Sequence, residues 1–133
     1  MRMIRDPGDI LDRFSIATLK KERIGLPSNI REYHLFEQGY ADLCNEFNDQ
    51  RIYLANMLSR LIDINSHIWN LESAVRQGQL DSDIPEVGRR AISIRQTNAK
   101  RIILCNEINR HFNEGVENVK KYHVSGEGSP DKA

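Results

Sequence analysis

Residues 51–76 read RIYLANMLSRLIDINSHIWNLESAVR, and this stretch decides the fold. It contains no proline, and its apolar side chains recur every three or four residues, which is the spacing of one face of an α-helix. The stripe consists of Leu54, Leu58, Leu61, Asn65, Ile68 and Leu71. The pattern predicts a helix from about Arg51 to Gln77, and the segment 78–83, which lacks such a stripe, is expected to be a loop.

A first helix has a clear start and end in the sequence. Asp6 can cap it, and Pro7 suits the first helical position. The helix is expected to run to about Ile24 and to stop at Gly25, because glycine readily adopts the left-handed conformation that ends helices.

Two further helices are predicted. One follows a cap at Ser28 or Asn29, and Asn48–Asp49 is expected to separate it from the helix that begins at Arg51. A single bent helix over 28–77 is the alternative, and the sequence does not decide between the two. The other extends from about Ile84 to Asn113. The apolar stripes of these helices are Ile30, Tyr33, Phe36, Tyr40, Leu43 and Phe47, and Ile94, Asn98, Arg101, Cys105, Ile108 and Phe112.

No segment shows the alternation of a β-strand, so the predicted fold is all-α, an antiparallel bundle of about four main helices. The chain has 133 residues, which suits a single domain with one core. We expect this domain to cover residues 1–123. The segment 124–133 lacks large apolar residues and is expected to be a flexible tail.

Composition excludes several classes of function. Lys and Arg total 19, as do Asp and Glu, so the net charge of zero argues against general nucleic-acid binding. There is no apolar run of membrane-spanning length and no apolar signal segment near the start, so a cytoplasmic protein without membrane contact is expected. Cys44 and Cys105 form no CxxC pair, which is typical of a reducing compartment.

Several polar residues occupy positions where apolar ones are expected. Asn65 and Asn98 each lie within an apolar stripe. Each also begins a set at helical offsets of 0, 4, 7 and 11, which places its members on one face: Asn65, Trp69, Glu72 and Arg76, and Asn98, Ile102, Cys105 and Asn109. A buried amide must find hydrogen-bond partners, so these faces indicate a polar network or a cleft.

Antiparallel packing of the last two helices sharpens this expectation. If their loop centres near residue 80, residues whose numbers sum to about 160 lie opposite each other. Asn65 then faces the turn 95–98, with Arg101 one turn further along, and Glu72 faces residues 89–90.

Amides and guanidinium groups beside Trp69 would suit a phosphate or carboxylate attached to a ring. The first helix could add its Asp12–Arg13 edge or its Ser15–Glu22 edge. The alternative interpretation is an internal network that fixes the register of the helices. Both interpretations stay open at this point.

Metal and nucleophile chemistry have less support. Asp63 with His67, and Glu107 with His111, have i,i+4 spacing, but the register separates the two pairs by about 20 Å. They cannot share an ion, and no metal site or cofactor is expected. The chain has no P-loop and no nucleophile motif, so whether it catalyses a reaction remains open.

Four stretches taken in order resemble a family. They are DILDRFSIATLKKERI (9–24), IWNLESAVR (68–76), TNAKRIILCNEIN (97–109) and VKKYH (119–123). Together they resemble a group of uncharacterised bacterial helical domains of unknown function, over most of the chain except residues 25–60. The resemblance implies a helical fold and the polar motif residues Asp12, Arg13, Ser15, Trp69, Glu72, Arg76, Asn98, Arg101, Glu107 and Asn109. Ser73 and Ala99 replace acidic residues of the family pattern, which weakens an acid/base or metal role.

The leading functional hypothesis is a helical protein that binds an anionic small molecule, of the nucleotide or sugar-phosphate type, in a polar pocket between helices. The expected ligand-binding residues are Asp12, Arg13, Asn65, Trp69, Glu72, Arg76, Asn98, Arg101 and Asn109. One alternative is an adaptor that forms a homodimer or higher homo-oligomer and binds no small ligand. Another is a metal-dependent phosphohydrolase that uses Asp12, Glu72 and Glu107.

Overall fold

The computed structural model describes residues 6–112, and within this range it contains helices and no strand. The elements are α1 (Pro7–Arg23), α2 (Pro27–Glu46), the short 3-10 helix η1 (Asn48–Gln50), α3 (Arg51–Arg76) and α4 (Ile84–Phe112). The predicted all-α fold with four main helices is therefore confirmed. The segment 124–133, which was expected to be a tail, lies outside the described residues.

Helix α1 begins and ends where the sequence predicts. The Asp6 carboxylate accepts a hydrogen bond of 2.7 Å from the backbone N–H of Asp9, and Pro7 is the first helical residue. At the other end the N–H of Gly25 donates to the carbonyl of Lys20, and Gly25 has a φ of 74°. These contacts satisfy backbone groups that a helix terminus leaves open.

Helix α2 begins one to two residues before the predicted cap. Pro27 is its first residue, so Leu26 occupies the cap position rather than Ser28 or Asn29. The fixed φ of proline suits the first helical position. The side chain of Asn29 reaches back and accepts a 3.1 Å hydrogen bond from the N–H of Leu26.

The connection between α2 and α3 is the turn η1, so residues 28–77 form two helices and the single bent helix is wrong. Arg51, the first residue of α3, stabilises this turn through side-chain hydrogen bonds. Its guanidinium donates to the side-chain oxygens of Asn45 and Asn48, each over 2.7 Å. The predicted break at Asn48–Asp49 is thus confirmed.

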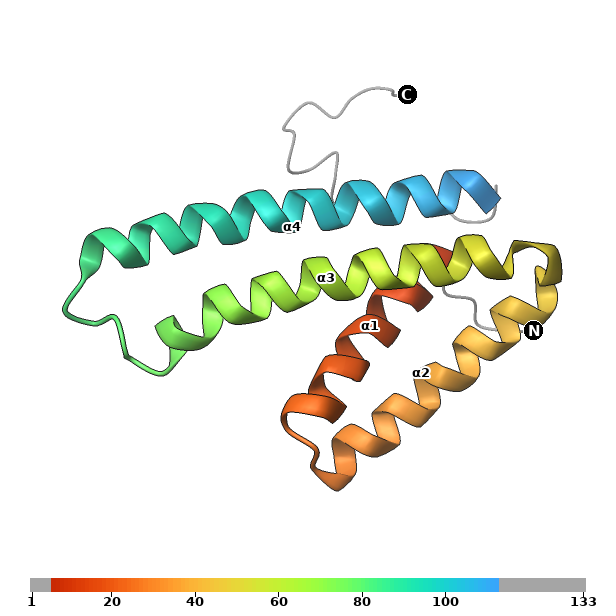
Figure 1. The fold of residues 1–133 in the computed structure, drawn as a ribbon, viewed down its shortest axis with the longest axis horizontal. Helices are drawn as coiled ribbons and strands as arrows, with labels where there is room; N and C mark the ends of the chain where they lie inside the picture. The colour runs from red at the N-terminus through yellow and green to blue at the C-terminus, as the bar shows by residue number, and fades with distance from the viewer. Residues whose placement is uncertain (1–5, 113–133) are drawn as a thin grey trace.

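Helices α3 and α4 form a long antiparallel hairpin (Figure 1). Asp83 caps α4 by accepting a 3.0 Å hydrogen bond from the N–H of Glu86. The Arg90 guanidinium lies 3.4 Å from the carbonyl oxygen of Asn70, as the predicted register requires. None of the helices within residues 6–112 is both long and apolar enough to span a bilayer.

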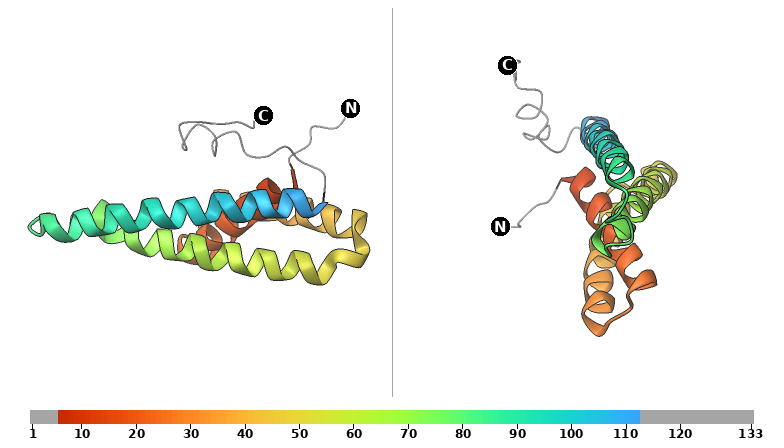
Figure 2. Two further views of the ribbon diagram at one scale, coloured as in Figure 1. Left: turned by 90° about the horizontal axis from the view of Figure 1, so that it is seen from above. Right: turned by 90° about the vertical axis from the view of Figure 1, so that its left-hand side faces the viewer.

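Helices α1 and α2 form a second hairpin that lies against one half of the α3–α4 hairpin (Figures 1 and 2). Helix α1 is central, because it packs against α2, α3 and α4. The core lies around it and includes the fully buried side chains of Leu11, Leu54, Leu61 and Ile108. On its other side, Phe14 packs against the rings of Tyr33 and Tyr40 at centroid distances of 5.4 and 5.3 Å.

The far half of the α3–α4 hairpin has no such cover. We call residues 66–96 the arm, and none of them is buried. Its large apolar side chains are all half-buried or exposed, namely Ile68, Trp69, Leu71, Val75, Leu80, Ile84, Val87, Ile92 and Ile94. The arm is therefore a two-helix extension beyond the core.

The close approach of α1 to α4 depends on a glycine. A Cβ atom at Gly8 would lie 2.5 Å from the carbonyl oxygen of Cys105, which is a backbone atom of a helix and cannot move aside. We expect Gly8→Ala to lower the free energy of unfolding by about 2 kcal/mol, as overpacking of a core does. Urea denaturation measures this change.

Gly39→Ala is the matched control. Its Cβ would meet only Ile10 Cγ2 at 3.9 Å, an ordinary contact, and Gly39 lies inside α2. Alanine there should stabilise the protein by up to about 1 kcal/mol. Equal effects of the two substitutions would contradict the proposed close approach.

Candidate functional site

A polar cluster lies where α1 meets α3 and α4. We call Asp12, Ser15, Asn65 and Arg101 the junction cluster. The Nδ2 group of Asn65 donates to Asp12 Oδ1 over 3.0 Å and to Ser15 Oγ over 2.7 Å, and the Ser15 hydroxyl donates to the backbone carbonyl of Asp12 over 2.6 Å. Asn65 is only 7% exposed, so these bonds replace the water that its amide loses on burial. Each edge of the first helix that the sequence singled out contributes one residue to the cluster, Asp12 and Ser15.

Arg101 completes the cluster with a looser contact. Its Nη1 atom lies 3.6 Å from Asp12 Oδ2, which is an ion pair longer than a hydrogen bond. The side chain of Arg101 is 25% exposed and that of Asp12 is 14% exposed. Arg101 makes no hydrogen bond to another residue of 6–112. Its guanidinium is thus oriented by Asp12 and still has donors to offer.

Asn109 ties the start of α1 to α4. Its Oδ1 atom accepts a buried 2.7 Å hydrogen bond from the N–H of Gly8, one of the donors that the first turn of a helix leaves open. The sequence singled out Asn109 but not Gly8. The sequence around Gly8 does not indicate that this position needs glycine, because the need arises from the close approach of Cys105 on α4.

Asn98 lies one turn before Arg101 on α4 and is half-buried. Within residues 6–112 its amide has no hydrogen-bond partner. Residues three apart on a helix are neighbours. Asn98 and Arg101 therefore form a pair of polar side chains at the edge of the junction cluster, and we call this pair with Asp12 the open edge.

Trp69 lies one turn after Asn65 on α3 and meets an arginine of α1. The Arg23 guanidinium carbon is 5.5 Å from the centroid of the indole ring, within the range of a cation–π contact. Arg23 also donates to Asn70 Oδ1 over 3.2 Å and to Ser66 Oγ over 2.6 Å. Arg23 is not among the ligand-binding residues expected from the sequence, although it shares a helix face with Asp12.

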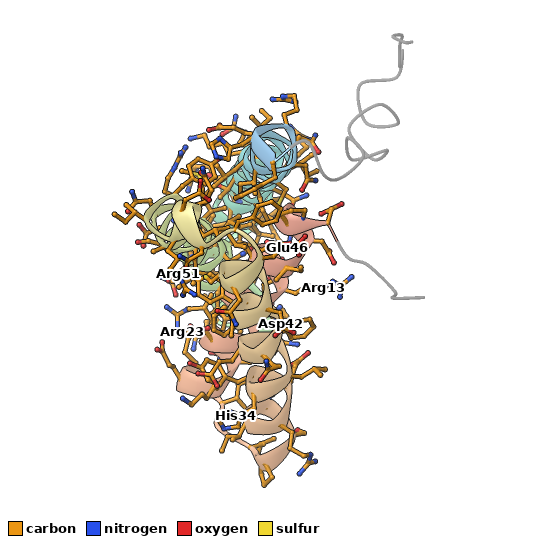
Figure 3. All side chains as sticks on the ribbon, turned by 90° about the vertical axis from the view of Figure 1, so that its right-hand side faces the viewer. Arg13, Arg23, His34, Asp42, Glu46 and Arg51 are labelled. Carbon is orange, nitrogen blue, oxygen red and sulfur yellow. The ribbon has the colours of Figure 1, made fainter. Side chains whose placement is uncertain are left out.

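The remaining predicted residues lie outside the junction cluster. Arg13 pairs with Asp9 at 3.0 Å and points away from the bundle (Figure 3). Glu72 pairs with Arg76 at 3.1 Å on the exposed side of α3 rather than with the arginines at 89–90. Both of those arginines pair with Glu86 of their own helix.

The structure forms no metal centre within residues 6–112, where three or more His, Cys, Asp or Glu side chains are nowhere grouped to hold an ion. The ring of His111 stacks on Tyr53 at 3.7 Å between centroids, and its Nε2 atom lies 2.8 Å from Gln50 Oε1. Burial raises the pKa of Tyr53, and the nearby charge of Glu107 raises it further. Glu107 is exposed and lies close enough to Tyr53 for its charge to act on the phenol.

Cys105 is buried beside the junction cluster. Burial raises its pKa to about 12, and the charge of Asp12 adds to this rise, while Arg101 opposes it. The thiol therefore remains protonated at neutral pH, and a thiol in this state is a poor nucleophile.

The Asn65 hydrogen bonds generate a first test. In Asn65→Asp a carboxylate would face the Asp12 carboxylate at about 3 Å, and two such charges repel in a partly dry site. We expect a loss of about 3 kcal/mol in the free energy of unfolding at pH 7. The loss should shrink toward pH 4, because protonation of either group restores a donor. Chemical denaturation at both pH values measures it.

Asn56→Asp makes the same change at an exposed position of α3 and should stay within about 0.5 kcal/mol of the wild type. A similarly small effect of Asn65→Asp would contradict the inferred role of its amide.

The raised pKa of Cys105 generates a second test. An unfolded thiol has a pKa of about 8.5, whereas the pKa of the folded Cys105 thiol is about 12. Its contribution to stability is therefore complete below about pH 8.5 and is lost as the pH rises toward 12, at up to about 1.4 kcal/mol per pH unit. The free energy of unfolding should fall more steeply between pH 8 and 10 in the wild type than in Cys105→Ala. Parallel curves would contradict the assignment.

Comparison of the chain with known protein families, with characterised proteins and with solved structures gives no match.

Proposed function

We propose that the protein binds a small anionic molecule at the open edge, through Arg101 and Asn98 of α4. The observation that carries this proposal is the state of Arg101. Its guanidinium is held by Asp12 at 3.6 Å and is a quarter exposed. Asp12 draws the guanidinium toward the junction cluster, and the N–H donors of Arg101 stay available to a ligand.

The chemistry of the pair favours an oxygen anion. A guanidinium presents five N–H donors in a planar fork that matches two oxygens of a phosphate or carboxylate. The Asn98 amide, one turn away, supplies a further donor. Asp12 balances part of the charge of Arg101, so the arrangement favours an anion of low charge over a polyphosphate.

The proposed site is smaller than the one that the sequence suggested. The side chains of Asn65 and Asn109 form hydrogen bonds to α1 and hold that helix in place, so they are not free to bind a ligand. Trp69 lies under Arg23 and is not part of the open edge. The ligand class remains that of a phosphate monoester or carboxylate, with the sugar-phosphate and nucleoside monophosphate forms as the first to test.

Binding is tested by thermal shift with inorganic phosphate, a hexose monophosphate, a nucleoside monophosphate and acetate at constant ionic strength. A ligand at about a hundred times its Kd adds about 2.7 kcal/mol, which raises Tm by several degrees. We expect Arg101→Gln to abolish the shift. Lys100→Gln removes the same charge from an exposed neighbouring position and should retain it.

Asn98→Ala provides a second variant, because it removes an amide without a partner in residues 6–112 and should leave the fold intact. It should weaken binding about tenfold, the loss of one hydrogen bond to a charged group. If no anion shifts Tm, or if Lys100→Gln and Arg101→Gln weaken binding equally, the proposal is wrong.

A further inference from the structure

The outer face of α4 in the arm is apolar and uncovered. Ile84, Gly88, Ala91 and Ile92 follow one another at offsets of 0, 4, 7 and 8 and so share a side of the helix. All four are exposed, with Ile84 at 69% and Ile92 at 47%. Ile84 and Ile92 stand two helical turns apart on this face, and only the small residues Gly88 and Ala91 lie between them on the same side. An exposed apolar face of this kind is a candidate for contact with a partner.

The arm carries balanced charge. It contains four acidic residues and four arginines, so its net charge is zero. Glu72 pairs with Arg76, and Glu86 pairs with both arginines at 89–90. Asp81, in the loop at the tip of the arm, and Arg95, at its base, make no ion pair with another described residue. Two opposite charges thus stand unpaired at the two ends of the apolar face.

We propose that this face binds a second copy of the chain, with α4 antiparallel to α4 of the partner and the two-fold axis at Gly88. Residues equally far from Gly88 on either side then lie opposite each other. Ile84 meets the partner's Ile92. Asp81 lies in the loop just before α4 and comes near the partner's Arg95 at the end of the contact. Each of these contacts occurs twice, as in any two-fold interface.

The observations favour a second copy because the face is complementary to itself. About the proposed two-fold axis, apolar residues lie opposite apolar residues and an acidic residue lies near an arginine. Because the net charge of the arm is zero, two copies of it do not repel each other. Gly88 suits the point of closest approach, since nothing lies within 4 Å of its Cβ position. The inference is independent of the proposed ligand site, because Arg101 and Asn98 lie outside the arm.

Sedimentation equilibrium of the full chain tests the pairing. We expect a dimer whose Kd rises at least about tenfold in Ile92→Glu, because this change buries a charge in an apolar contact. Ile103→Glu is the matched control, since Ile103 lies on the same helix outside the arm and is 55% exposed. Gly88→Gln should raise Kd as well, although it improves the helix propensity of the monomer, so misfolding cannot mimic its effect.

Charge exchange tests the antiparallel arrangement. Arg95→Glu and Asp81→Arg should each weaken the dimer, because each places like charges together, and the double variant should restore it. A chain that stays monomeric at every concentration, a dimer that Ile92→Glu leaves unchanged, or equal weakening by Ile103→Glu would overturn the pairing. Failure of the double variant to restore a dimer that both single variants weaken would overturn the two-fold axis at Gly88.

Discussion

The buried amide of Asn65 imposes the constraint on which the rest of the structure depends. An amide that is shielded from water must be hydrogen-bonded, and its donors point away from the helix that carries it. Only α1 supplies the acceptors, through Asp12 and Ser15. The Asn109 bond to Gly8 adds a second fixed point on α4. Two polar contacts from two different helices therefore fix α1 in both rotation and position along the hairpin, which apolar packing alone does not do.

Because α1 is fixed at this position, it does not cover the arm of the α3–α4 hairpin. Helix α1 has 17 residues, or about 25 Å, whereas α4 has 29 residues, or about 43 Å. Because Gly8 of α1 lies against the last turns of α4, the shorter α1 does not reach the first turns of α4. The arm is thus a consequence of helix length and of the place where the amides hold α1. Its apolar residues stay half-buried or exposed for this reason, although their periodicity is that of a core-facing helix.

The sequence predicted the helices well because their signals are local. Periodicity, proline spacing and the Asp6 cap act within a few residues, and antiparallel register follows from one short loop. The place of α1 could not be predicted in this way, because the periodicity of a helix defines its apolar face but not the angle at which it crosses two others. The position of Asn65 within the apolar stripe therefore predicted that its amide is buried, but it did not identify the hydrogen-bond partners. For the same reason Trp69 was grouped with amides of α4, whereas Arg23 of α1 covers it.

The two proposals depend on different parts of this architecture. The open edge exists only while α1 is docked, because Asp12 orients the Arg101 guanidinium from across the junction. The apolar face of the arm requires only α3 and α4. An anion bound at Arg101 would thus stabilise the docking of α1 without changing the face that a second copy covers. Since the two sites share no side chain and no hydrogen bond among the described residues, binding at one is expected to be energetically independent of binding at the other.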